Sequence, residues 1–157
     1  MPNVSEIMTT QVQVIEPQQT LAEAARLMRA LDIGALPVCS GRLLVGMVTD
    51  RDIALRGVAE GLAPEQACVS DVMTSPAVWV TEDQDTQEVM RLMGQQQIRR
   101  MPVINLDKEL VGIVSLGDLA VRAPDHVDEA MREISLPDTG PTGEVIRPAQ
   151  TPVVEVQ

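Results

Sequence analysis

The 157-residue sequence almost lacks aromatic side chains: Trp79 stands alone, and there is neither phenylalanine nor tyrosine. Although 45% of the residues are hydrophobic, the core must be built from aliphatic side chains and from the nine methionines. Proteins that bind single-stranded nucleic acids without sequence preference stack the bases on several aromatic side chains. The composition therefore argues against that class of function.

Positive charge is also scarce, because 12 basic residues face 23 acidic ones and the formal net charge is −11. Such a field repels phosphate backbones and anionic membrane surfaces. No apolar run approaches the length that spans a bilayer, and the first residues lack the basic and apolar parts of a signal peptide. We expect a soluble, cytoplasmic protein that binds neither nucleic acid nor membrane.

Metal and redox chemistry have few candidate residues. Cys39 and Cys68 are the two cysteines and form no CxxC pair, so we interpret them as inert buried thiols, with redox sensing as an alternative. His126 is the one histidine. Its neighbouring carboxylates bring no further ligand set, so a solvated helix face is the better interpretation and we expect no metal site.

The sequence contains an internal repeat. Residues 4–9 match residues 69–74 at a constant offset, which then holds through the Pro37-Val38 and Pro102-Val103 steps. One additional residue shifts the register, after which residues 44–46 match residues 110–112. We define the first repeat as residues 4–60, the second as residues 69–123, and a C-terminal part as residues 124–157.

The hydrophobic pattern of each repeat predicts a strand, a helix, two strands and a second helix. Thr20 and Glu23 form a capping box at the first helix, and Asp85 and Glu88 begin its counterpart. Neither half can bury both faces of its sheet, so the halves should pack on each other about a pseudo-two-fold axis. The predicted strands are 12–15, 36–39, 43–48, 78–80, 101–104 and 110–114. The predicted helices are 20–31, 50–58, one that begins at the cap of Asp85 and Glu88, one that ends at Arg122, and 125–134. From residue 136 on, we expect a flexible tail or an arm that lies on a neighbour.

A hydroxyl residue and a carboxylate three positions later lie at each strand-to-helix junction, as Thr49 with Asp52 and Ser115 with Asp118. This pair is a standard device for capping a helix. The same geometry can hold the hydroxyl groups of a ribose and, on the free amides of the first turn, a phosphate. The motif alone leaves both interpretations open.

These features resemble the paired cystathionine-β-synthase-type (CBS) domain, or Bateman module. The resemblance is carried by Met-Thr at the beginning of each repeat, the apolar-Pro-Val steps, and Gly-apolar-apolar-Thr/Ser-x-x-Asp, and it extends over residues 4 to 135. Small stand-alone bacterial CBS proteins, including hypoxic-response types, are similar. The resemblance implies an α/β (α+β) fold of two βαββα units, a disc-like homodimer, and two clefts that take AMP, ADP, ATP, NADH or S-adenosylmethionine.

Transferred residue by residue, the resemblance predicts a first cleft around the Thr49 motif. Arg99 and Arg100 are expected to clamp a phosphate, with a solvated, ion-paired loop as the alternative. Trp79 is a candidate for stacking on adenine, with a place in the core or an interface as the alternative. The predicted residues are Thr49, Arg51, Asp52, Val78, Trp79, Val80, Arg99, Arg100, Met101 and Pro102.

The second cleft is predicted around the Ser115 motif and is expected to bind more weakly. Gly34 and Ala35 stand where the first cleft has its arginines, and Gly117 replaces Arg51. We therefore expect nucleotide phosphate to prefer the first cleft. The predicted residues are Val14, Ile15, Gly34, Ala35, Pro37, Ser115 and Asp118, with Val12 adjoining them.

The sequence has no general acid and base pair, activated nucleophile or metal set that would indicate an enzyme. The function expected is a regulatory module that binds an adenosine-containing ligand between the repeats, requires no cofactor, and acts through a homodimer or a downstream protein. The alternative is a CBS dimer without nucleotide, acting as an interaction or redox-responsive module.

Overall fold

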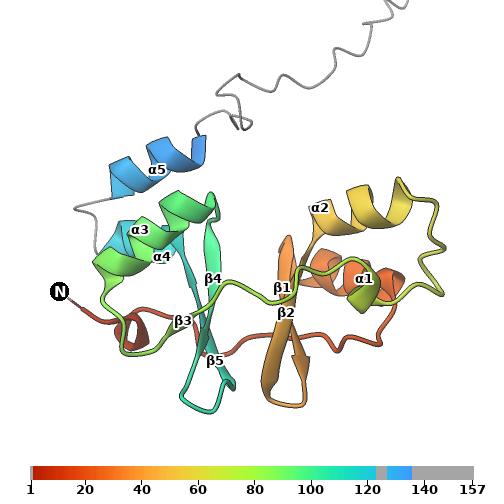
Figure 1. Ribbon diagram of the computed structural model, residues 1–157, viewed down its shortest axis with the longest axis horizontal. Helices are drawn as coiled ribbons and strands as arrows, with labels where there is room; N and C mark the ends of the chain where they lie inside the picture. The colour runs from red at the N-terminus through yellow and green to blue at the C-terminus, as the bar shows by residue number, and fades with distance from the viewer. Residues whose placement is uncertain (1, 123–126, 136–157) are drawn as a thin grey trace, which may run out of the picture.

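The computed structural model describes residues 2–122 and 127–135, which form two units side by side (Figure 1). One unit contains α1 (Leu21–Leu31), β1 (Ala35–Ser40), β2 (Leu43–Thr49), α2 (Asp50–Asp52) and the π-helix η2 (Ile53–Val58). The other contains β3 (Val80–Thr81), α3 (Thr86–Gln96), β4 (Arg100–Ile104), β5 (Leu110–Ser115), α4 (Leu116–Arg122) and α5 (Val127–Ser135). Two short 3₁₀ helices, η1 (Val4–Glu6) and η3 (Val69–Asp71), begin the two repeats.

Helix α1 begins and ends as local chemistry predicts. The Glu23 amide donates to Thr20 Oγ1 at 3.2 Å and the Thr20 amide donates to Glu23 Oε2 at 2.9 Å, which confirms the capping box. The helix ends at Asp32, whose φ of 53° is left-handed. In α3 the carboxylate of Asp85 accepts from the Gln87 amide at 2.7 Å and caps the helix.

The two sheets differ in their first strand. In both units the two later strands form antiparallel hairpins, β1 with β2 and β4 with β5. β3 adds a parallel strand to the second sheet by pairing Val80 with Val103. The strand predicted over residues 12–15 is reduced to a single parallel bridge between Ile15 and Val38. In this bridge the Ile15 amide donates to the Pro37 carbonyl at 3.0 Å.

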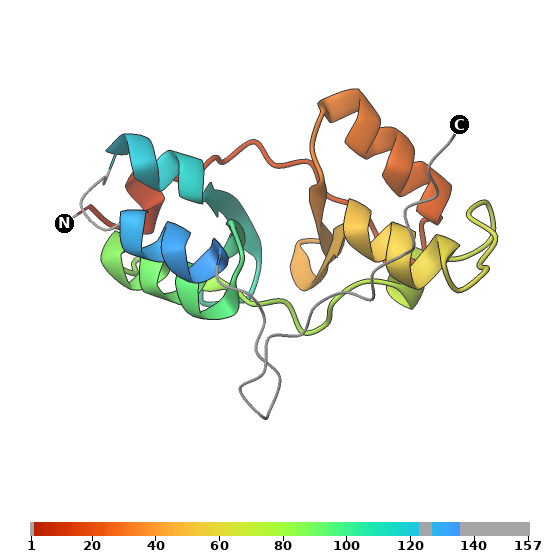
Figure 2. The ribbon, with the colours of Figure 1, turned by 90° about the horizontal axis from the view of Figure 1, so that it is seen from above.

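The beginning of each repeat packs into the unit formed by the other repeat. The Val4 amide donates to the Gln84 carbonyl at 3.0 Å, and the Val69 amide donates to the Gln19 carbonyl at 2.8 Å. Val4 lies in the core of the second unit and Val69 in that of the first. Figure 2 shows the two connecting segments crossing between the units on opposite sides. The repeats are therefore interlocked in space.

Matching contacts define the pseudo-two-fold axis between the units. Thr9 and Ile113 exchange backbone hydrogen bonds of 2.8 and 2.9 Å, and their counterparts Thr74 and Met47 exchange bonds of 2.8 and 3.0 Å. The hairpin turns also meet, since the Leu44 amide donates to the Lys108 carbonyl at 3.2 Å and the Leu110 amide to the Arg42 carbonyl at 3.0 Å. These paired contacts support the predicted packing of the two halves.

The last helices depart in detail from the predicted bounds. The helix expected over residues 50–58 begins as one turn of α-helix and widens into η2, where the Ala59 amide donates to the Ala54 carbonyl at 2.9 Å. Helix α5 covers Val127–Ser135. The predicted beginning of that helix, His126 and the tail of residues 136–157 lie outside the described residues.

Candidate functional site

The first motif forms a complete helix cap at the beginning of α2. The Asp52 amide donates to Thr49 Oγ1 at 3.0 Å, and the Thr49 amide donates to Asp52 Oδ2 at 3.0 Å. Within the described residues, Asp52 Oδ1 and the hydroxyl proton of Thr49 have no hydrogen-bond partner. The capping interpretation is confirmed, and each side chain keeps one polar atom free for a ligand.

The second motif is capped more tightly, at the beginning of α4. The Ser115 amide donates to Asp118 Oδ2 at 2.9 Å, and the Asp118 amide donates to Ser115 Oγ at 3.1 Å. The Ser115 hydroxyl also donates to Asp118 Oδ2, at 2.8 Å. The hydroxyl proton is therefore engaged, whereas Asp118 Oδ1 has no partner within the part of the chain that is described.

A cavity of about 420 Å³ lies at the second cleft. This volume is within the range of about 300–1,000 Å³ that ligand pockets span. One wall is the extended segment entering the first unit, another is the beginning of β1, and a third comes from the second repeat. The lining residues are Thr9, Gln11, Val12, Gln13, Leu31, Ile33, Ala35, Pro37, Arg100, Ile113, Ser115 and Asp118.

Arg100 lines this cavity, although the sequence placed it only in the first cleft. The sequence alone did not predict a basic side chain from the second repeat at this cleft. The reason is strand register: Arg100 begins β4 and lies opposite Ser115 on β5. Its guanidinium makes no hydrogen bond or ion pair with any described residue.

Several predicted residues turn their side chains away from the clefts. Ile15, Val80 and Met101 are fully buried in the two cores, because the extended segments alternate their side chains between core and surface. Val14 lines a separate cavity of about 360 Å³ next to the hairpin turns. Gly34 lies against Asp50, whose Oδ2 would be 2.9 Å from an added Cβ atom.

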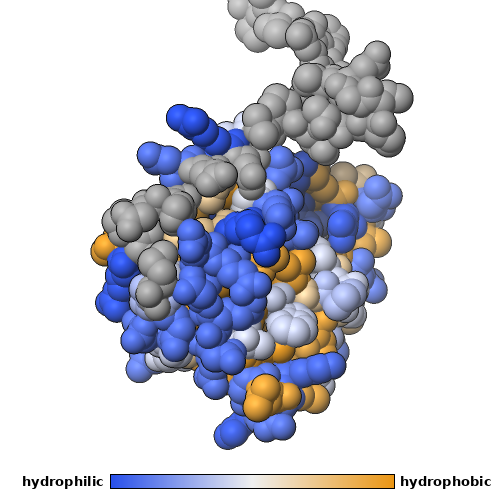
Figure 3. Space-filling view, turned by 60° about the vertical axis from the view of Figure 1, so that its left-hand side comes forward, coloured by the Kyte–Doolittle hydropathy of each residue, from blue (hydrophilic) through white to orange (hydrophobic). Residues whose placement is uncertain are grey.

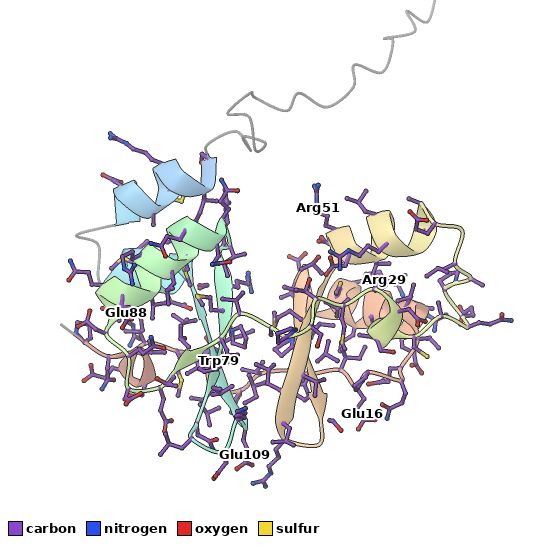
Figure 4. All side chains as sticks on the ribbon, viewed as in Figure 1. Glu16, Arg29, Arg51, Trp79, Glu88 and Glu109 are labelled. Carbon is purple, nitrogen blue, oxygen red and sulfur yellow. The ribbon has the colours of Figure 1, made fainter. Side chains whose placement is uncertain are left out.

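Of the remaining first-cleft residues, Pro102 is buried in β4, whereas Arg51, Val78, Trp79 and Arg99 are exposed. Trp79 is 45% exposed and Val78 39% exposed, so Trp79 is not a core residue. Figure 4 shows Arg51 projecting from the beginning of α2, while Trp79 lies lower, on the segment that leads to β3. In Figure 3 an apolar band interrupts a mostly hydrophilic face. Arg99 is exposed, and its carbonyl accepts from the Leu116 amide at 2.8 Å.

Sequence reasoning missed the polar wall of the second cleft. Thr9, Gln11 and Gln13 face the 420 Å³ cavity, Thr10 and Val14 face the smaller one, and Val12 lines both. This alternation is that of an extended chain, in which successive side chains point to opposite sides. The period of two from Thr9 to Val14 was the available signal for which residues share a wall.

Cys39 lies in β1, is 2% exposed and lines the smaller cavity. Burial raises the pKa of its thiol from 9.0 to about 11, so the thiol stays protonated at neutral pH. The thiolate is the reactive form. The interpretation of Cys39 as an inert buried thiol is thus supported, while Cys68 is only half-buried.

Residues 2–122 and 127–135 offer neither a metal site nor a membrane-spanning helix. They contain no group of three His, Cys, Asp or Glu side chains arranged to hold a metal ion. None of their helices is both long and apolar enough to cross a bilayer.

Two interlocked βα repeats with a ligand-sized cavity between them define a paired-repeat binding module. The CBS domain family model matches residues 4–57 and 69–125, so this chain belongs to the CBS-domain family as a tandem pair. CBS domain-containing protein YhcV of Bacillus subtilis is 47% identical over 121 residues, which cover 77% of this chain and 85% of that protein. Hypoxic response protein 1 of Mycobacterium tuberculosis is 39% identical over 127 residues, covering 80% and 88%.

Solved structures share the fold. Hypoxic Response Protein I, whose crystal structure has two coordinated zinc ions, superposes with a TM-score of 0.72 at 39% identity and covers 78% of this chain and 100% of that one. CBSX2, whose crystal structure is a complex with AMP, superposes with a TM-score of 0.68 at 26% identity and covers 82% and 99%. The resemblance to the CBS-domain pair and the fold class predicted from the sequence are confirmed.

Proposed function

We propose that this CBS pair is a regulatory module that binds an adenosine-containing ligand between its repeats and catalyses no reaction. The observation that carries the proposal is the 420 Å³ cavity, because it joins a free carboxylate oxygen of Asp118, the unpaired guanidinium of Arg100 and apolar walls from both repeats. The complex of the related CBSX2 with AMP supports the choice of ligand class.

Each part of such a ligand finds a matching group. A carboxylate that uses one oxygen to cap α4 can accept from ribose hydroxyls with the other. A guanidinium binds phosphate through charge-assisted hydrogen bonds. Ile33, Pro37 and Ile113 supply apolar surface for a base. In the first cleft, Asp52 has the same free carboxylate oxygen and Thr49 also has a free hydroxyl proton, and exposed Trp79 and Val78 are candidates for the base.

The mechanism follows from the position of the cavity between the units. A ligand that contacts both repeats stabilises the relative orientation that it fits best, by no more than its difference in affinity between orientations. A second copy of the chain or a downstream protein would detect that orientation. No nucleic acid, membrane or metal takes part in this proposal.

Thermal unfolding with AMP, ADP, ATP, NADH and S-adenosylmethionine tests the proposal. We expect at least one of them to raise the unfolding temperature of the wild-type chain. Asp118→Asn should reduce that shift, because the amide keeps an acceptor for the α4 cap and loses the charge that binds the ribose hydroxyls. Asp85→Asn is the matched control, since Asp85 also caps a helix but lines neither cavity.

The two variants separate binding from stability. An equal loss of the shift in Asp118→Asn and Asp85→Asn would mean that the carboxylate of Asp118 does not contact the ligand. No shift with any of the five compounds would favour the alternative, in which both motifs are only helix caps and the module acts through protein interaction.

A further inference from the structure

The first residue of the Pro-containing strand lies where the two clefts meet. Ala35 begins β1 and pairs with Thr49, and its counterpart Arg100 begins β4 and pairs with Ser115. The cavity of the second cleft is lined by both Ala35 and Arg100. The pseudo-two-fold axis carries each of these residues onto the other. The first cleft is therefore bordered by the same two residues with their roles exchanged.

Only one of these two positions carries a charge. Arg100 presents a guanidinium with no partner among the described residues, whereas Ala35 presents a methyl group. The other arginines predicted for the first cleft stand at positions whose counterparts, Gly34 and Gly117, do not line the cavity of the second. Among the described residues, Arg100 is the arginine that lines the second cleft, and the pseudo-symmetry places it at the border of the first as well.

We propose that Arg100 is shared between the two clefts, so that a phosphate-bearing ligand in one cleft weakens the binding of a phosphate-bearing ligand in the other. This inference rests on the proposed function and specifies its regulation. When the guanidinium binds one phosphate, the second phosphate has only the methyl group of Ala35 beside it. It is also repelled by the first phosphate and by a chain whose net charge is −11. The weakening is reciprocal, because coupling between two binding equilibria acts equally in both directions.

The coupling depends on the phosphate, which provides the test. Isothermal titration of the full chain with adenosine should give two sites of similar affinity, because the uncharged nucleoside does not need Arg100. Titration with AMP should give one site, followed by a second that is at least tenfold weaker. The tenfold difference corresponds to the loss of one charge-assisted hydrogen bond.

Three variants locate the effect. Arg100→Met keeps an unbranched side chain, and it should weaken AMP at both clefts, remove the coupling and leave adenosine binding unchanged. Ala35→Arg gives each cleft its own guanidinium, and it should bind two AMP molecules of similar affinity. Arg91→Met is the matched control, because Arg91 is exposed on α3 and lines neither cavity, and it should behave as the wild type. Thermal unfolding of each variant without ligand checks its folding.

The outcomes distinguish this inference from the proposed function. If the wild type binds adenosine and fills two equal, independent AMP sites, the shared arginine is refuted while ligand binding stands. The inference is also overturned if Arg100→Met weakens AMP at one site only, or if Arg91→Met has the same effect as Arg100→Met. If neither adenosine nor AMP binds, the shared arginine is refuted, while thermal unfolding with the five compounds decides the proposed function.

Discussion

At the scale of single residues, Cys39 shows how burial sets chemistry. The sequence predicted an inert thiol from its lack of a partner cysteine, and the structure gives the cause. Cys39 is in the buried run of β1, and the loss of water disfavours its thiolate, which raises its pKa to about 11. A redox-responsive role would need a thiolate that this environment suppresses.

The raised pKa predicts how stability depends on pH. An unfolded chain releases the Cys39 proton near pH 9, whereas the folded chain keeps it until about pH 11. The free energy of unfolding should therefore be unaffected by this group below pH 9 and fall by about 1–2 kcal/mol as the pH rises from 9 to 11. Urea denaturation at pH 8, 9.5 and 11 measures the change.

Cys39→Ala provides the control for that prediction. The variant should lose most of the difference between pH 8 and pH 11. The background is favourable, because the sequence contains no tyrosine and Lys108 is its one lysine. An equally steep fall in Cys39→Ala would assign the pH dependence to other groups.

At the scale of secondary-structure elements, two glycines on β2 and β5 let the crossing segments approach. A Cβ atom on Gly112 of β5 would lie 2.9 Å from the Thr9 carbonyl oxygen and 2.6 Å from Met8 Sδ. Its counterpart on Gly46 of β2 would lie 2.7 Å from the Thr74 carbonyl oxygen. Because backbone atoms cannot move aside as a flexible side chain can, these contacts require glycine.

Gly112→Ala should therefore destabilise the chain, by about 1–3 kcal/mol, as overpacking of a tight contact does. Gly117→Ala is the matched variant five residues later. Its Cβ atom would meet only Ser115 Oγ at 3.5 Å, an ordinary contact, within helix α4. Alanine there should stabilise by about 0.5–1 kcal/mol, since glycine is the poorer helix former. Urea denaturation compares the two; equal effects would contradict the contact.

The same scale separates what the sequence could predict from what it could not. The caps at Thr20, Thr49 and Ser115 were predictable because both partners lie within four residues of each other. That the side chains of Val80 and Ile15 point into the cores was not predictable, because tertiary contacts set the register of short extended segments that lack a full hairpin. The position of Arg100 was not predictable for the same reason. Arg100 lines the second cleft because it pairs with Ser115, and alignment of the two repeats does not reveal that pairing.

At the scale of the whole molecule, each of the short helices η1 and η3 packs into the unit formed by the other repeat, an exchange that makes the two repeats depend on each other. The repeat was recognisable from its internal matches. Which unit each Met-Thr segment packs into was not, because η1 and η3 have nearly identical sequences and both cores offer an apolar surface. The contacts of Val4 with the second unit and Val69 with the first settle the point.

This exchange predicts which fragment of the chain can fold alone. Residues 10–75 contain every buried member of the first core: Ile15, Leu21, Ala24, Met28, Leu36, Val38, Val48, Val69 and Val72. Residues 1–60, the first repeat as the sequence delimits it, lack Val69 and Val72 and expose Val4 and Ile7 instead. We expect cooperative thermal unfolding, followed by circular dichroism, for residues 10–75 and a broad, non-cooperative change for residues 1–60.

The comparison is informative because the two fragments have similar lengths and share residues 10–60. A small domain of this size is marginally stable, so the loss of two buried valines, each contributing about 1.5–3 kcal/mol, is enough to prevent folding. Val69→Ala within residues 10–75 should lower the unfolding temperature, whereas Ser70→Ala, at an exposed neighbour, should not. If residues 1–60 unfolded as cooperatively as residues 10–75, the repeats would be independent units and a ligand between them could not act through their interlocking.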